Sequence, residues 1–260
     1  MTTLIIMPLV LEILMVLAIS LVIAFIGFLI FRKKFSHEIL AENHIVGSYI
    51  FNGFSVTYGV LIAFVVYANW FGYEKAQQNV TEETTYLSNF YRDTRILPDS
   101  VKSIVTDKLI KYTEAVVEDE WPLMAKGETS PKAMNALDDL WDTYSRIPVS
   151  KITNTYFYQV SIEKLNLVSM QRRLRILDMN QTTPEVIWIV IVLCAFISVS
   201  YSYFFTTKKR KAHLFLIASL IVINVSLFYL IYVLDHPYQG YATISPEPFK
   251  LILNKFVTGL

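Results

Sequence analysis

The chain has 260 residues, of which 54% are hydrophobic, and its mean hydropathy is +0.43. A water-soluble core of this length needs a smaller apolar fraction, so these values indicate insertion into a membrane. The 23 Lys and Arg residues nearly balance the 22 Asp and Glu residues, which argues against nucleic acid as a partner. The single cysteine, Cys194, excludes an internal disulfide and a thiolate metal cluster.

Four apolar runs are long enough to cross a lipid bilayer, which takes about 18 or more apolar residues. They extend over residues 4–31, 45–71, 186–205 and 214–234. Basic residues follow the first run at Arg32 to Lys34, and they link the last two runs at Lys208 to Lys211. Because basic residues hold short loops in the cytoplasm, we predict an inner (plasma) membrane protein whose N- and C-termini are both extracytoplasmic.

The polar interval from 72 to 183 predicts a helical domain. Its first helix continues out of the second run and stops at Leu97, because Pro98 cannot continue a helix. Asp99 is placed to cap a second helix, Ser130 a third, and the last begins at Ser150. Their predicted buried faces are Val101, Ile104, Val105, Leu109, Tyr112 and Val116 in the second, Met134, Leu137, Leu140, Trp141 and Tyr144 in the third, and Leu167, Met170, Leu174 and Leu177 in the last.

These patterns predict an all-α membrane protein of four transmembrane helices, with an extracytoplasmic helical bundle inserted between the second and third. Transmembrane helices one and two occupy residues 1–71, the bundle 72–183, helices three and four 184–234, and an extracytoplasmic tail 235–260. In the tail, Ser245 to Pro248 has the composition of a helix start. We expect the short helix that follows to lie along the outer membrane interface, or equally to cover the mouth of a pore.

The sequence contains no motif for a catalytic or cofactor site. The histidines His37, His44, His213 and His236 do not have the spacing of metal ligands, and neither a phosphate loop nor a nucleophile elbow occurs. We therefore predict no enzyme activity, metal or cofactor. Glu118, Asp119 and Glu120 stand at a helix end, where they form a candidate cation site, ion-pair partners or a solvated turn. Arg172, Arg173 and Arg175 are explained by a helix C-terminus, which favours cations.

The second apolar run carries small or polar residues at intervals of three or four, so that they share one helical face. They are Ser48, Asn52, Ser55, Gly59, Ala63, Val66 and Trp70. Such a face allows close helix packing, because small residues let two backbones approach. It is equally suited to lining a water-filled pore, with a narrow apolar ring as a gate. The candidate pore-lining residues are Asn52, Ser55, Gly59, Ala63, Val66 and Tyr67.

Four segments resemble the bacterial bestrophin-like membrane protein family of unknown function. They are Tyr58 to Tyr67, Tyr112 to Pro122 with Met124 and Gly127, Leu234 to Gly240, and Ser245 to Phe249. The resemblance covers nearly the whole chain from Gly47 and implies distant kinship with bestrophins, which are pentameric anion channels lined by their second transmembrane helix and gated by calcium. The chain is expected to differ from bestrophins in placing its soluble helices, between spans two and three, on the extracytoplasmic side, and in lacking a recognisable run of acidic calcium ligands.

Two functions remain open. The preferred hypothesis is a homo-oligomeric ion channel, with the lipid bilayer, further copies of the chain (a pentamer, by resemblance) and inorganic ions as its partners. The alternative is a membrane sensor or scaffold whose extracytoplasmic helical domain binds a ligand or a partner protein. The cytoplasmic segments predicted for this chain are only short loops, so a sensor would need a separate protein to carry its signal.

Overall fold

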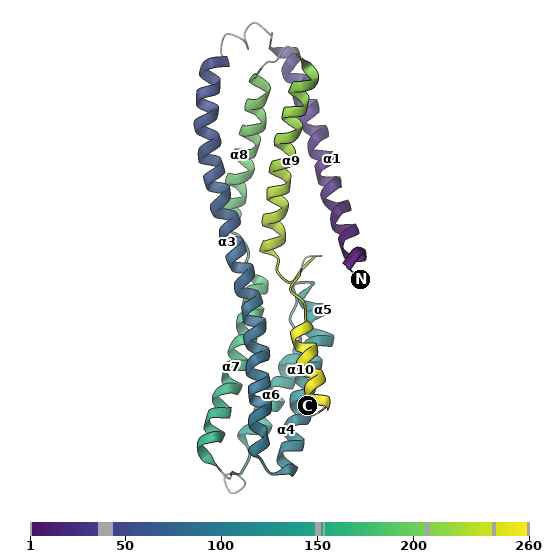
Figure 1. Ribbon diagram of the computed structural model, residues 1–260, viewed down its shortest axis with the longest axis vertical. Coiled ribbons are helices and arrows are strands. Elements are labelled where there is room, and N and C mark those ends of the chain that lie inside the picture. Colours follow the sequence, from purple (N-terminus) through teal and green to yellow (C-terminus); the bar gives the residue numbers. More distant parts are fainter. Residues whose placement is uncertain are drawn as a thin grey trace. The chain divides into compact units, whose positions relative to one another are not determined.

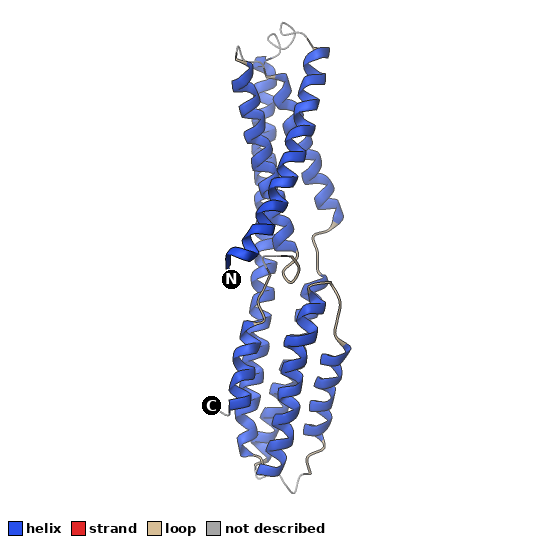
Figure 2. Ribbon diagram, turned by 90° about the vertical axis from the view of Figure 1, so that its right-hand side faces the viewer, coloured by secondary structure: helices blue, strands red, loops and turns tan. Residues whose placement is uncertain are grey.

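The computed structural model describes residues 2–35, 44–148, 152, 154–205, 209–240 and 243–258, with side chains from residue 10 onward and without that of His44. Every regular element in these ranges is helical, and they contain no strand (Figure 2). His37, Lys208 and Ser150 lie outside the described residues. The helix start predicted at Ser150 is wrong, because α7 (Thr155–Asn180) begins at Thr155, where the Asn154 side chain caps it by accepting from the Tyr156 and Phe157 amides. The chain divides into two compact units. Unit 1 comprises residues 1–71 and 182–235, and unit 2 comprises 72–181 and 236–260.

Unit 1 consists of α1 (Thr2–Lys34), the first half of α3 (His44–Asp93), α8 (Glu185–Phe204) and α9 (Arg210–Asp235) (Figure 1). Four segments of the described chain are long and apolar enough to cross a membrane: Val10–Lys34, Ile45–Ile96, Thr155–Phe204 and Arg210–Asp235. Most of their side chains are exposed in the single chain, which suits helices that meet lipid or other protein rather than water. The chain is a membrane protein.

Two apolar clusters hold unit 1 together. One joins α1 to α8 and α9 through Phe28, Tyr203 and Ile221, all buried. The other joins α3 to α8 and α9 through Ile62, Ile191 and Ile231. Helices α1 and α3 therefore pack on different parts of the α8–α9 pair.

Unit 2 contains the second half of α3 and shorter helices that enclose one apolar core. Their bounds are η1 Thr94–Ile96, α4 Asp99–Ala115, η2 Val116–Glu120, α5 Trp121–Met124, α6 Pro131–Ser145, α7 Thr155–Asn180 and α10 Glu247–Thr258. Local signals set several of these bounds. The Ser130 hydroxyl accepts a hydrogen bond from the Ala133 amide at 3.0 Å, as predicted for a cap. Asp99 is the first residue of α4, and Pro98 takes the cap position.

The predicted buried face of α7 is wrong. Met170 and Leu177 are 51% and 55% exposed, whereas Leu165, Val168 and Arg175 are completely buried. The prediction took apolar residues at a 3–4 spacing as the buried face and explained Arg175 as a cation near a helix C-terminus. The side of α7 that carries Arg175 is buried instead, because two glutamates neutralise the guanidinium and make this polar side chain compatible with the core. Ile104 of α4 and Met134 of α6 were also predicted to be buried and are exposed.

Helix α10 is amphipathic, as expected, but its apolar face does not lie free for a membrane interface. Phe249 is completely buried in the core of unit 2, and Phe256 is nearly so. The Phe249 ring lies 5.6 Å from that of Trp121, and the Phe256 ring lies 4.7 Å from that of Tyr91. An amphipathic pattern alone does not distinguish a protein core from a lipid interface, so the expected interfacial position is replaced by one in unit 2.

Candidate functional site

The apolar half of α3 attaches to its own chain by one narrow face. Ile62 and Val65 are buried, and Tyr58 and Leu61 pack beside them against α8 and α9. These residues recur at the spacing of one helical face. Most of the remaining circumference, including Val56, Val60, Phe64, Tyr67 and Trp70, has at least half of each side chain exposed.

The predicted small and polar stripe runs along the border of this packing face. Asn52, Gly59, Ala63 and Tyr67 are exposed, whereas Ser55 and Val66 are partly covered. A methyl group built on Gly59 would meet no atom within 4 Å, and the same holds for Gly47 and Gly53. The glycines therefore do not serve close packing within this chain. A small residue at these positions can therefore matter only for contact with water or with another molecule.

Polar contacts also fix the packing face of α3 against its neighbours. The Tyr58 hydroxyl donates to Asn224 Oδ1 at 2.6 Å, and Asn224 Nδ2 donates to the Leu220 carbonyl at 2.8 Å. Nearer unit 2, Asp235 Oδ1 accepts from the Thr183 amide at 2.6 Å, and the Thr183 hydroxyl lies 2.9 Å from Asn69 Oδ1. These side chains keep the orientation of α3 constant. Local sequence patterns do not reveal these contacts, because the partners are 52 to 166 residues apart, except for the bond within α9.

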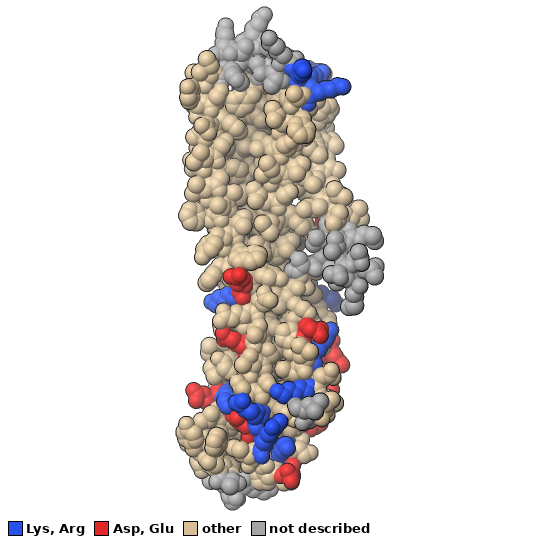
Figure 3. Space-filling view, in the orientation of Figure 1, with Lys and Arg blue, Asp and Glu red and all other residues tan. Residues whose placement is uncertain are grey.

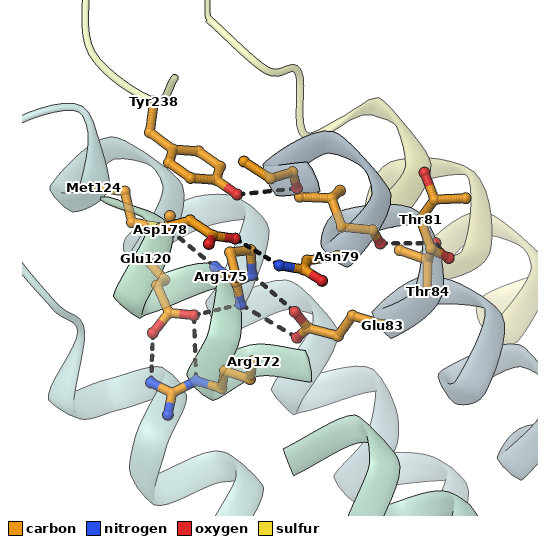
Figure 4. A network of polar contacts seen from close by, with 12 residues as sticks. Asn79, Thr81, Glu83, Thr84, Glu120, Met124, Arg172, Arg175, Asp178 and Tyr238 are labelled. Atoms are coloured by element: carbon orange, nitrogen blue, oxygen red, sulfur yellow. Dashed lines mark hydrogen bonds and ion pairs between the residues drawn. The ribbon is translucent and has the colours of Figure 1, made fainter. Parts of the chain in front are cut away.

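Unit 2 contains a buried charge network around Arg175 (Figure 4). Arg175 Nε donates to Glu83 Oε2 at 2.8 Å, and Nη2 donates to Glu120 Oε2 at the same distance. Nη1 lies 2.9 Å from the sulfur of Met124. The guanidinium carbon is also 5.3 Å from the ring centroid of Trp121 and 5.4 Å from that of Phe249. Arg175 is thus held on every side, by charge and by aromatic faces.

The network balances its charges. Arg172 pairs with Glu120, so that two arginines face two glutamates. The Tyr112 hydroxyl donates to Glu83 Oε1 at 2.7 Å, and burial and the neighbouring Glu83 raise the pKa of Tyr112 well above its usual value. Tyr112 therefore remains a neutral donor. A network with compensated charges and filled hydrogen bonds stabilises and orders unit 2, and it offers no free nucleophile or base.

A π-helical turn places Glu120 in this network. The turn covers Val116–Glu120 and directly precedes Trp121 and Pro122. Pro122 has no amide hydrogen, and its ring crowds the carbonyl four residues earlier. A widened turn at this point relieves that steric clash. The sequence analysis noted this proline but did not anticipate the widened turn.

The candidate cation site is not assembled. Glu118 is exposed, Asp119 accepts a hydrogen bond from the Ser130 hydroxyl, and Glu120 is completely buried between Arg172 and Arg175. Successive helical residues point in different directions, which separates the three carboxylates. Among the residues that the structure describes, no group of three or more His, Cys, Asp or Glu side chains is arranged to hold a metal ion. The ion-pair alternative is confirmed for Glu120.

Comparisons with known proteins identify the family. The bestrophin-like domain profile matches residues 14–249. Two crystal structures of variants of a bacterial bestrophin homologue from Klebsiella pneumoniae are similar in fold, with TM-scores of 0.72 and 0.69 at 11% identity. Each match covers 95% of this chain, and it covers 98% and 99% of the respective homologue. No curated protein matches the sequence. The chain belongs to the bestrophin-like family.

Proposed function

We propose that the protein is a homo-oligomeric ion channel of the cytoplasmic membrane whose pore is lined by α3. The observation that carries the proposal is the face of α3 formed by Asn52, Gly59, Ala63 and Tyr67, which is exposed in the single chain. Polar and small residues at membrane depth avoid lipid, and around the axis of an oligomer they would meet water. Membership of the bestrophin-like family supports the same reading.

The proposed topology places both basic loops in the cytoplasm. Helices α1, α3, α8 and α9 then cross the membrane in alternating directions, and unit 2 and both termini are extracytoplasmic. The fixed orientation of α3 supports this arrangement, because Tyr58 and Asn224 present the same side of the helix to α9 in every subunit. A pentamer is the oligomer implied by resemblance to bestrophins. Inorganic ions are the proposed substrate.

The test is ion conductance of the purified protein in a planar lipid bilayer. Gly59→Leu should reduce the conductance, because a large apolar side chain would narrow the pore. Ala63→Ser should increase the conductance, because a hydroxyl group makes the narrow apolar part of the pore easier to wet. Phe64→Leu is the control, since Phe64 lies on α3 away from the stripe and is 68% exposed. The oligomer of each variant should elute unchanged from a sizing column, which separates occlusion from failed assembly.

A wild-type protein that conducts no ion at any voltage, ion gradient or calcium level would remove the main support for a channel and favour the sensor or scaffold. A conducting protein in which all three variants match the wild type would retain the channel and reject the face of α3 assigned to its pore.

A further inference from the structure

Unit 1 contains a groove of about 980 Å³ that the proposed pore does not use. Its walls are α1 and α8, and α9 forms its floor. Glu12 and Lys34 line its two ends, and most of the side chains between them are apolar, such as Val16, Val192 and Val225. Within this membrane-embedded unit, the groove therefore requires an apolar occupant.

The groove has the length of one bilayer core. Glu12 and Lys34 are 22 residues apart on α1, or about 33 Å at the helical rise, whereas the hydrocarbon core is about 30 Å thick. An elongated, largely apolar groove of this length suits flexible acyl chains, which can fill an irregular space along the bilayer core.

The two ends of the groove differ in charge. The lining includes Trp188, Tyr229 and Tyr232 as well as Glu12, and the Tyr229 hydroxyl lies 3.4 Å from Glu12 Oε2. Such aromatic rings are typical of the membrane–water interface. At the end opposite Glu12, Lys34 lines the opening. Lys33, in the last turn of α1, and Arg210 and Lys211, at the start of α9, are also exposed. Figure 3 shows Lys and Arg side chains gathered at the upper end of the view. These cations at one opening favour an anionic group there.

Hydrogen bonds hold this basic opening in place. His213 Nδ1 accepts from Arg32 Nη2 at 3.0 Å, and His213 Nε2 donates to the Ser202 carbonyl at 2.8 Å. One imidazole thus ties the ends of α1, α8 and α9 together. The Tyr203 hydroxyl adds a bond to the Ala24 carbonyl at 2.9 Å, and Gly27 lets the Tyr203 ring approach α1 closely. The cations around the opening therefore belong to an ordered part of unit 1.

We propose that this groove binds an anionic phospholipid, with acyl chains between α1 and α8 and its phosphate at Lys34. The apolar walls recognise the chains, and the basic opening selects the head group. The site is distinct from the pore face, because none of the residues that line it belongs to α3, although one of them, Asn224, also accepts the hydrogen bond from Tyr58.

The test is native mass spectrometry of the purified full chain, titrated in detergent with phosphatidylglycerol or with phosphatidylcholine of the same acyl chains. The wild type should retain phosphatidylglycerol more tightly, by about five-fold for each cation that contacts the phosphate. Lys34→Gln should reduce this preference, whereas Lys111→Gln on α4 should leave it unchanged. Equal retention of both lipids by the wild type would overturn the proposal.

A second pair of variants tests the groove itself. Ser20→Trp places a large ring in the groove and should abolish retention of both lipids, whereas Ile19→Trp at the adjacent, outward position should leave retention unchanged. Equal retention by these two variants would show that the lipid binds elsewhere. In a Cys194→Ala background, efficient disulfide crosslinking between copies through Val192→Cys would assign the groove to a second copy and would equally overturn the proposal.

Discussion

At the scale of single residues, the buried Arg175 is the feature that the sequence analysis treated least correctly. It explained Arg172, Arg173 and Arg175 together as cations near a helix end. Only Arg173 is exposed, and the other two bind Glu120. Nothing local distinguishes three neighbouring arginines, since their partners are contributed by α3 and the π-helical turn. Position on the helix and distant partners determine the role of each.

Arg175→Met should destabilise unit 2 strongly, because it leaves Glu83 and Glu120 buried with one cation fewer. Breaking a buried pair in this way costs about 3–5 kcal/mol. Arg173→Met is the matched control, and its effect should remain within about 0.5 kcal/mol. Thermal unfolding of the full chain in detergent, followed by circular dichroism, compares the two. Equal melting temperatures would contradict the structural role assigned to the network.

Tyr144 should make unit 2 sensitive to alkali. Burial raises its pKa from 10.0 to about 12, against a lowering contribution from its hydrogen bond with Ser161. A raised folded-state pKa means that the folded state retains its proton longer than the unfolded chain. The stability from this group is therefore complete below pH 10 and decreases as the pH rises toward 12.

The measurement is the free energy of unfolding as a function of pH. Tyr144→Phe loses a hydrogen bond, so it should be less stable than the wild type at neutral pH, but its stability should decrease less between pH 10 and 12. Tyr156→Phe is the control, because Tyr156 is 69% exposed. A pH profile for Tyr144→Phe that parallels the wild type would contradict this assignment.

At the scale of elements, the sequence predicted where helices end better than which face they bury. Caps and prolines act within a few residues, so Pro98 and Ser130 mark real boundaries of α4 and α6. The buried side of α7 depends on Glu83 and Glu120, and the buried side of α10 depends on aromatic residues more than 100 positions earlier. A local sequence pattern carries no information about such distant partners.

The cap at Ser130 gives a prediction for α6. Ser130→Ala removes the acceptor for the Ala133 amide and the donor to Asp119, and we expect a loss of about 1–2 kcal/mol in the stability of unit 2. Ser103→Ala, at an exposed interior position of α4, is the control and should change stability by less than about 0.5 kcal/mol. Chemical denaturation of both variants checks this, and a Ser130→Ala effect no larger than that of Ser103→Ala would refute the capping role.

At the scale of the whole molecule, hydropathy predicted four apolar segments, and the described chain contains four helices long and apolar enough to cross a membrane, because a bilayer imposes length and composition on each segment separately. The face of α3 proposed to line a pore is a harder problem. The sequence analysis selected it by the spacing of small residues and left close packing as an alternative. The open space around Gly59 argues against packing within the chain, but only a partner or water gives that face a function.

The proposed topology predicts the accessibility of cysteines introduced into a Cys194→Ala background. Lys126→Cys and Lys250→Cys should react with an impermeant thiol reagent on intact cells, and Lys209→Cys only after the membrane is permeabilised, since basic loops remain cytoplasmic. Labelling of Lys126→Cys only after permeabilisation would reverse the topology. Equal labelling of Lys209→Cys and Lys250→Cys would reveal a membrane crossing that the proposal omits.

The central claim is that ions pass along the Gly59 face of α3, and the most direct test is chemical modification of an open channel. In a planar bilayer, a charged methanethiosulfonate reagent should change the current through Gly59→Cys in the Cys194→Ala background, because the thiol would face the aqueous path. The same reagent should leave the current through Phe64→Cys unchanged. If modification alters the Phe64→Cys current and leaves the Gly59→Cys current intact, α3 does not line the pore with the face assigned to it.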